Sequence, residues 1–173
     1  MSVLEKRIEE DIKKIKQLQG EYPSIIDSVQ VHSQNDHAIR ILLNIPTAQD
    51  SDYPRNIQKS SDIRIELTAR YPFDAPKVSV KSPIWNPNIY ESGLICLGNK
   101  WLPTQGLELL VLRVMQILAL DPLIINTSSP AHREANSWYL HVKSQNPRLF
   151  PTVDFEKMKR GQARPTIKWK PIQ

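Results

Sequence analysis

The sequence predicts an α+β fold, in which a helix is followed by an antiparallel sheet, a long irregular loop and further helices. Two observations support this prediction. Apolar residues recur every three or four positions at the start of the chain, and at every second position in several of the segments that follow. The strand-like segments also come together, before the later helices, which is typical of α+β rather than alternating α/β chains.

The opening helix is predicted for residues 3–19. Its apolar positions form one stripe and most of its other positions are Glu or Lys, so we expect one buried face and one charged face. Gly20 and Pro23 are expected to end it. The stripe consists of Val3, Leu4, Ile8, Ile12, Ile15 and Leu18.

A four-stranded antiparallel meander is predicted next. Its segments are rich in β-branched residues, and the second and third alternate clearly between apolar and polar positions. A tight turn is expected at 35–37, and a long polar loop at 46–62. The four strand segments are 24–33, 37–45, 61–69 and 75–82.

Periodicity disappears between Ser82 and Pro103, where several prolines and glycines exclude a long regular element. Such a long irregular connection in a compact domain usually carries function. It contains the single cysteine of the chain, Cys96. An almost wholly apolar, buried helix is predicted at 106–120 and ends at Asp121 and Pro122.

A second, more polar helix is predicted at 129–145. We expect Ser128 or Ser129 to cap it, with Pro130 in its first turn. The division that we predict is a domain at 1–153 and a basic C-terminal extension at 154–173.

The composition excludes several classes of protein. The net charge is +5, the basic residues are spread along the chain with a concentration in the last twenty residues, and no nucleic-acid-binding signature accompanies them. No apolar run is long enough to cross a membrane, and the charged N-terminus lacks a secretory signal. One cysteine cannot form an intramolecular disulfide, so we expect a cytoplasmic protein.

Five motifs then occur in a telling order: "YPFDAPKV" at 71–78, "NPN" at 86–88, "GLICL" at 93–97, "WLP" at 101–103 and "DP" at 121–122. In this order the chain resembles the ubiquitin-conjugating enzymes, across roughly residues 1–150. Asn88 precedes Cys96 by eight residues, the spacing that this family keeps between its motif Asn and its catalytic cysteine. Two positions depart from the family pattern: Asn86 replaces the motif His, and Ser129 replaces an Asp.

The resemblance implies carrier chemistry, in which Cys96 accepts ubiquitin or a ubiquitin-like protein from an activating enzyme and passes it to an amine, usually that of lysine. Cysteine suits this chemistry because its thiolate is a good nucleophile and its thioester stays reactive. Asn88 would stabilise the oxyanion or brace the loop. Neither a metal nor an organic cofactor is required. The supporting loop residues are Asn86, Pro87, Trp101 and Ser129.

Three further residues are candidate helpers for the attacking lysine, whose amine has to be neutral: Asp121, Asn126 and His132. Each also has a structural interpretation, which we favour for each residue taken alone: Asp121 as a helix-end residue, Asn126 as a turn residue and His132 as an exposed helical residue. Lys6, Arg7, Lys13 and Lys14 on the first helix are candidate contacts to partner proteins. The expected partners are the modifier, the activating enzyme, a ligase and a target. Divergent members of the family occur in bacterial ubiquitin-like conjugation operons, which raises the expectation of a role in such a system, including antiviral defence.

Two other interpretations stay open from the sequence. The first is a non-catalytic binding module of the same fold, which the altered positions 86 and 129 keep in view. The second is a cysteine hydrolase, in which Cys96 would act with His32, His37, His132 or His141.

Overall fold

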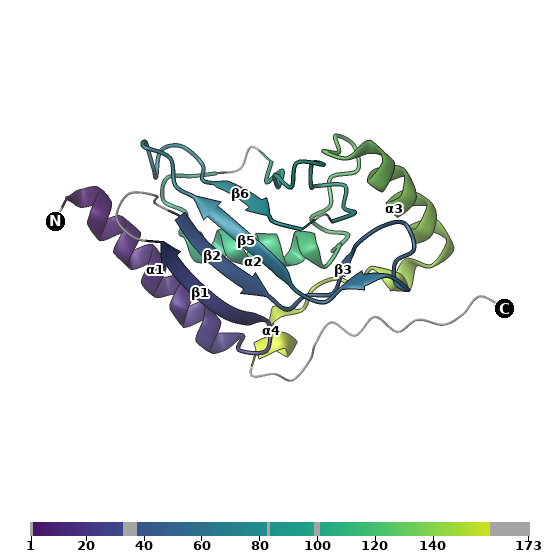
Figure 1. Cartoon of the computed structure of the whole chain (residues 1–173), viewed down its shortest axis with the longest axis horizontal. Helices are drawn as coiled ribbons and strands as arrows, with labels where there is room; N and C mark the ends of the chain where they lie inside the picture. Colours follow the sequence, from purple (N-terminus) through teal and green to yellow (C-terminus); the bar gives the residue numbers. More distant parts are fainter. Residues whose placement is uncertain (1, 33–37, 83, 99–100, 160–173) are drawn as a thin grey trace.

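The computed structural model describes residues 2–32, 38–82, 84–98 and 101–159. Its main sheet is the predicted four-stranded antiparallel meander, with the strands in the order β1-β2-β5-β6 (Figure 1). These strands are β1 (Ile26–His32), β2 (Ala38–Leu43), β5 (Ser61–Glu66) and β6 (Lys77–Val80). The helices are α1 (Val3–Glu21), α2 (Leu107–Leu118), α3 (Arg133–Gln145), the 3-10 turn η1 (Pro147–Leu149) and α4 (Phe155–Met158).

One face of the sheet forms the main core. Ile39 pairs with Ile65 and Ile41 with Ile63, so these side chains share one face, and all four are buried. They pack in one cluster with the apolar residues of α2 and with Ile15 and Leu18 of α1. The alternation in the sequence therefore correctly predicted which side of the sheet is covered.

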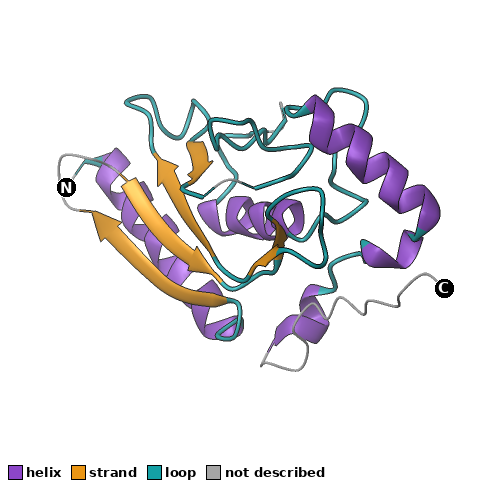
Figure 2. Ribbon diagram, turned by 45° about the vertical axis from the view of Figure 1, so that its right-hand side comes forward, coloured by secondary structure: helices purple, strands orange, loops and turns teal. Residues whose placement is uncertain are grey.

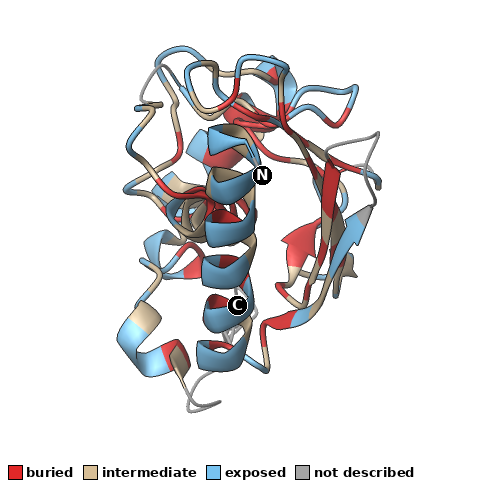
Figure 3. Cartoon of the chain, turned by 90° about the vertical axis from the view of Figure 1, so that its left-hand side faces the viewer, coloured by how far each residue is buried: buried red, intermediate tan, exposed pale blue. Residues whose placement is uncertain are grey.

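The outer face of α1 is the exposed, charged one. Figure 3 shows the length of this helix with its exposed residues turned outward and its buried residues turned toward the body of the protein. The helix begins at a capping box formed by Ser2 and Glu5. It continues through Gly20 to Glu21, so the prediction that Gly20 ends it is wrong.

The polar loop predicted at 46–62 contains two short strands, β3 (Thr47–Ala48) and β4 (Ile57–Gln58), which pair with each other. Its last residues, Ser61 and Asp62, already belong to β5. This small sheet could not be predicted, because two-residue strands leave no periodic pattern in the sequence. The turn expected at 35–37 lies outside the described residues.

A second apolar cluster joins α3 and η1 to the segment around β3 and contains Tyr53, Tyr139 and Phe150. The loops that connect β6, α2 and α3 lie between the sheet and α3 (Figure 2). Just beyond the division predicted at 153, α4 buries Met158 in the main core, and Phe155 meets Tyr22 edge to face. The division itself stays a prediction.

Within the described residues, no helix is long and apolar enough to cross a membrane.

Candidate active site

Cys96 lies at the end of a short doubled-back segment of the loop between β6 and α2. The segment is held by isolated bridges between Ser79 and Leu94 and between Ile89 and Ile95. Gly93 makes this fold possible, because its φ is 86° and an added Cβ would lie 2.4 Å from the carbonyl oxygen of Val80. The segment leaves the cysteine half-buried, with a free thiol.

Asn88 is the side chain that the structure ties to Cys96. Cys96 N–H donates to the carbonyl of Asn88 at 2.7 Å, and Asn88 Nδ2 donates to the carbonyl of Cys96 at 3.4 Å. The backbone N–H of Asn126 donates to Asn88 Oδ1 at 2.9 Å. Because a backbone N–H can only donate, this bond turns the amide oxygen toward Asn126 and the NH₂ group toward Cys96.

Asn86 is fully buried beneath the site. Its Nδ2 donates to the carbonyl of Ile117 at 2.7 Å, at the end of α2, and its Oδ1 accepts from Asn88 N–H at 2.9 Å. Its amide therefore supplies one donor and one acceptor, the same pair that a neutral imidazole offers. Although Asn86 departs from the family's His, both ends of its side-chain amide are thus hydrogen-bonded.

Pro87 completes the attachment of this motif. Its carbonyl accepts from Ala131 N–H at 2.8 Å and from His132 N–H at 3.2 Å, just before α3. We call residues 84–98 the Cys96 loop. Through Asn86, Pro87 and Asn88 this loop is bonded to the end of α2, to the start of α3 and to the turn at Asn126.

Asn126 and Ser129 belong to that turn. Asn126 Oδ1 accepts from Ser128 Oγ at 3.0 Å and from Ser129 N–H at 3.1 Å, and Ser129 itself is exposed. The turn therefore uses the hydroxyl of Ser128 and the backbone N–H of Ser129. Because α3 begins only at Arg133, the predictions that Ser128 or Ser129 caps it and that Pro130 lies in its first turn are wrong.

His132 is the residue that caps α3. Its Nδ1 accepts from Ala135 N–H at 3.3 Å, and its ring meets Trp85 edge to face at 4.7 Å. The residue is buried, so the expectation of an exposed helical residue is wrong, while its role as a lysine helper stays a prediction.

Asp121 has a structural task as well. It is fully buried, and its carboxylate accepts from Leu123 N–H at 2.9 Å, from Val153 N–H at 2.8 Å and from Gln116 Nε2 at 3.5 Å. These bonds stabilise the turn after α2 and fix the segment that follows η1. Asp121 therefore acts as a helix-end residue, and its role as a helper stays a prediction.

Trp101 lies beside Leu97 and Gly98, the two residues that follow Cys96. Its Nε1 donates to the carbonyl of Pro72 at 2.7 Å, and its ring lies 6.0 Å from that of Tyr71. The side chain is partly buried against the main core.

The four candidate partner contacts on α1 fall into two groups. Lys6, Lys13 and Lys14 are exposed, and Lys14 lies 3.6 Å from Glu108 of α2. Arg7 instead turns its guanidinium toward the protein and pairs with the buried Asp11 at 2.7 Å. Burial opposes the charge of Arg7, but the hydrogen bond and charge of Asp11 prevail and raise its pKa.

Asp11 was not among the predicted site residues, although its place in the α1 pattern is unusual for a charged residue. It stands at a buried position of the α1 face, between Ile8 and Ile15, where an apolar residue would be expected. A charged residue at such a position is seldom buried unless it is paired. The side chain is 1% exposed and accepts a hydrogen bond from Tyr71 Oη.

The comparisons with known proteins place the chain in a family. The family model described as "Ubiquitin-conjugating enzyme" matches residues 7–150. The chain belongs to the ubiquitin-conjugating enzyme family. The expected fold and the resemblance are therefore confirmed.

Curated relatives come from several sources. A ubiquitin-conjugating enzyme E2 of African swine fever virus (isolate Pig/Kenya/KEN-50/1950) is 30% identical over 130 residues, covering 69% of this chain and 56% of the viral protein. One from Yarrowia lipolytica is 35% identical over 94 residues, covering 52% of this chain and 60% of the yeast protein. The chain thus spans a little over half the length of these relatives.

A solved structure supports the fold. The E2 domain of a Toxoplasma gondii ubiquitin-conjugating enzyme matches with a TM-score of 0.57 at 22% identity, covering 84% of this chain and 90% of that domain. None of these similarities tests the expectation of a bacterial conjugation system, which stays a prediction.

Proposed function

We propose that this member of the family is a cysteine thioester carrier. It accepts ubiquitin or a ubiquitin-like protein on Cys96 from an activating enzyme and transfers it to an amine, usually that of a lysine. The observation that carries the proposal is the pairing of a free, half-buried Cys96 with an Asn88 whose NH₂ group faces it. A ligase and a target protein are the further partners that the family implies.

The first step is a transfer between thiols. The Cys96 thiolate attacks the thioester carbonyl carbon of the modifier, a new carbon–sulfur bond forms, and the sulfur of the activating enzyme leaves as a thiolate. In the second step the neutral amine attacks the same carbon and loses a proton. The bond to Cys96 breaks, an amide forms, and the Cys96 thiolate is regenerated.

Asn88 is placed to act in the second step. The tetrahedral intermediate carries an oxyanion, and a fixed amide donor beside it lowers the barrier by about 2.7–4 kcal/mol. The bond from Asn126 fixes this amide before the substrate arrives. In the absence of an acidic helper at position 129, the solvent at the exposed Ser129 is the simplest acceptor for the proton of the amine.

The two alternatives have less support. A pure binding module has no need for a free cysteine at this position. A cysteine hydrolase needs an imidazole beside the sulfur, but within the described part of the chain no histidine forms a hydrogen bond with Cys96, and His132 Nδ1 is used as a cap. His37 and the side chain of His32 lie outside the described residues.

The test is a charging assay with ubiquitin and a panel of ubiquitin-like proteins, each with its own activating enzyme and ATP. We expect a thiol-sensitive adduct with the wild type and none with Cys96→Ala. Cys96→Ser should give an oxyester that resists thiols. A wild type that stays uncharged with every modifier, while a control carrier enzyme charges, contradicts the proposal. Tight modifier binding in that case would favour the binding module.

A further inference from the structure

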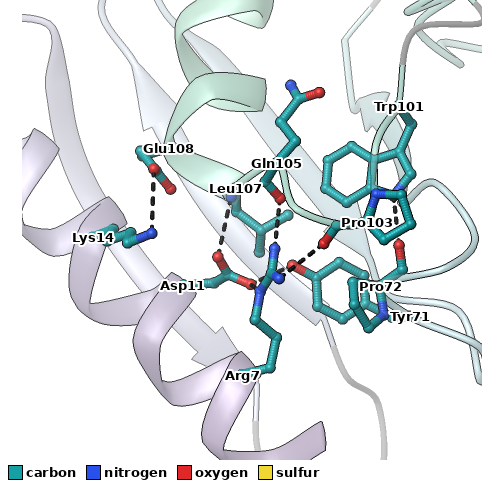
Figure 4. Close-up of polar contacts among 10 residues, drawn as sticks. All are labelled: Arg7, Asp11, Lys14, Tyr71, Pro72, Trp101, Pro103, Gln105, Leu107 and Glu108. Atoms are coloured by element: carbon teal, nitrogen blue, oxygen red, sulfur yellow. Dashed lines mark hydrogen bonds and ion pairs between the residues drawn. The ribbon is translucent and has the colours of Figure 1, made fainter.

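The guanidinium of Arg7 connects α1 to a distant part of the chain. Its Nε donates to Asp11, while its Nη1 donates to the carbonyl of Pro103 at 2.9 Å and its Nη2 to that of Gln105 at 2.6 Å (Figure 4). The two carbonyls belong to residues 101–106, which lead from the Cys96 loop to α2. A planar guanidinium suits such a set of diverging acceptors, because its donors point in fixed directions.

Asp11 adds two more connections from the same helix. One carboxylate oxygen accepts from the N–H of Leu107, the first residue of α2, at 3.3 Å. The other accepts from Tyr71 Oη as well as from Arg7. We call the three side chains Arg7, Asp11 and Tyr71 the Arg7 network. Burial, followed by the hydrogen bond to Asp11 and its charge, raises the pKa of Tyr71.

The network is costly unless it serves a geometric purpose. A buried carboxylate pays a desolvation penalty, and a well-packed apolar residue is often at least as stabilising in its place. Here its neighbours in sequence on the buried face, Ile8 and Ile15, are both apolar. Directional bonds to residues 101–107 are what an apolar side chain could not provide.

Residues 101–106 in turn contact the Cys96 loop. Trp101 and Gln105 line a small cavity together with Leu97 and Gly98, the two residues that directly follow Cys96. Trp101 is also fixed from the other side by its bond to the carbonyl of Pro72, next to Tyr71. The bond from Arg7 to the carbonyl of Gln105 therefore reaches a residue that lines this cavity next to Leu97 and Gly98, and the bonds to Pro103 and Leu107 hold the chain on either side of it.

We propose that Arg7 and Asp11 are positioning residues for the reaction at Cys96. They hold residues 101–106 so that the loop presents the thioester to the incoming amine in one geometry. The inference rests on the proposed carrier function. It assigns Arg7 a role inside the protein, distinct from the partner-docking role expected of the exposed lysines on the same helix.

The test separates positioning from docking. Purified thioester is mixed with free lysine, with no activating enzyme and no ligase present, and its discharge is followed in a single turnover. We expect Arg7→Lys to lower the maximal rate about tenfold, with the half-saturating lysine concentration unchanged, because misplaced reacting groups lose rate steeply. Lysine keeps the charge beside Asp11 but cannot donate along both directions of the guanidinium fork.

Two controls accompany this measurement. Lys16→Ala changes an exposed residue of α1 outside the Arg7 network and should discharge at the wild-type rate. The indole N–H signal of Trp101 in a ¹H–¹⁵N spectrum should shift in Arg7→Lys and stay in place in Lys16→Ala. This second measurement needs no modifier, and it also serves Arg7→Ala if that variant charges poorly.

The outcomes distinguish the two proposals. A wild type that never charges contradicts the carrier function. A charged Arg7→Lys that discharges to free lysine at the wild-type rate contradicts the positioning role alone, as does a rate loss that only matches a loss of folded protein in the same sample.

Discussion

Asn88 and Cys96 are joined by two hydrogen bonds of unequal length. The backbone bond, from Cys96 N–H to the carbonyl of Asn88, is 2.7 Å, whereas the side-chain bond, from Asn88 Nδ2 to the carbonyl of Cys96, is 3.4 Å. The first is a full-strength bond and the second lies beyond the usual range for N–H···O bonds. The strong bond fixes the loop, and in the proposed mechanism the weak one leaves the Asn88 amide as a donor for the oxyanion.

Removing this donor should slow aminolysis more than charging. We expect Asn88→Ala to form a thioester but to discharge it to lysine about 10²–10³-fold more slowly, the loss seen when an oxyanion donor is deleted. Single-turnover discharge of the purified thioester measures this effect.

Asn88→Asp is the matched variant. It keeps an acceptor for Asn126 N–H and loses the donor. If it discharges at the wild-type rate while Asn88→Ala is slow, bracing of the loop, and not oxyanion stabilisation, is the role of Asn88.

Asn86 should matter mainly for stability. In Asn86→Ala the buried N–H of Asn88 loses its acceptor and the carbonyl of Ile117 loses one donor, so we expect a loss of about 1–3 kcal/mol in the free energy of unfolding. Asn86→His should lose less, because a neutral imidazole also has one donor and one acceptor. Urea unfolding measures both, and an Asn86→Ala variant as stable as the wild type would contradict the proposed role.

The order of elements could be predicted from the sequence because each main element carries its own periodic pattern. The buried Ile39 and Ile41 alternate with the partly buried Arg40 and Leu42 in β2, and the α1 stripe repeats with the helical period. The resemblance also pointed to Asn88 and Cys96, whose separation of eight residues reflects the doubled-back segment between them.

The structural roles of Arg7, Asp121 and Ser129 could not be predicted, because they depend on contacts between distant parts of the chain. Arg7 resembles an ordinary surface residue of a charged helix, and only the fold brings it to the carbonyls of Pro103 and Gln105. The sequence indicates that Asp121 ends a helix, but not that it accepts a hydrogen bond from the N–H of the distant Val153. Helix-capping propensity favours Ser129 as a cap. In the structure the N–H of Ser129 instead donates to Asn126, and the N–H groups of Ala131 and His132 donate to the Pro87 carbonyl, so the helix begins later.

The cap of α3 tests directly whether such distant contacts outweigh the capping propensity of Ser129. We expect His132→Ala to lower the free energy of unfolding by about 1–2 kcal/mol, since Ala135 N–H loses its acceptor and Trp85 a packing partner. Ser129→Ala should stay within about 0.5 kcal/mol of the wild type, as exposed substitutions usually do. Urea unfolding of both variants measures the difference, and a reversed order would restore Ser129 as the cap.

Tyr139 should make the protein sensitive to alkali. The residue is fully buried, and burial, followed by the charge of Asp121, raises its pKa to about 12. In the unfolded chain the pKa is about 10. Between these two values the unfolded state releases the phenolic proton and the folded state keeps it, so stability is fully present below pH 10 and falls as the pH rises.

The variant Tyr139→Phe isolates this contribution. The Tyr139 hydroxyl has no hydrogen-bond partner among the described residues, so the variant should be nearly as stable as the wild type at pH 8. At pH 11, one unit above the unfolded pKa, the wild type should have lost about 1.4 kcal/mol more than the variant, because one pKa unit corresponds to that free energy. Urea unfolding at the two pH values measures the losses, and equal losses would show that Tyr139 ionises alike in both states.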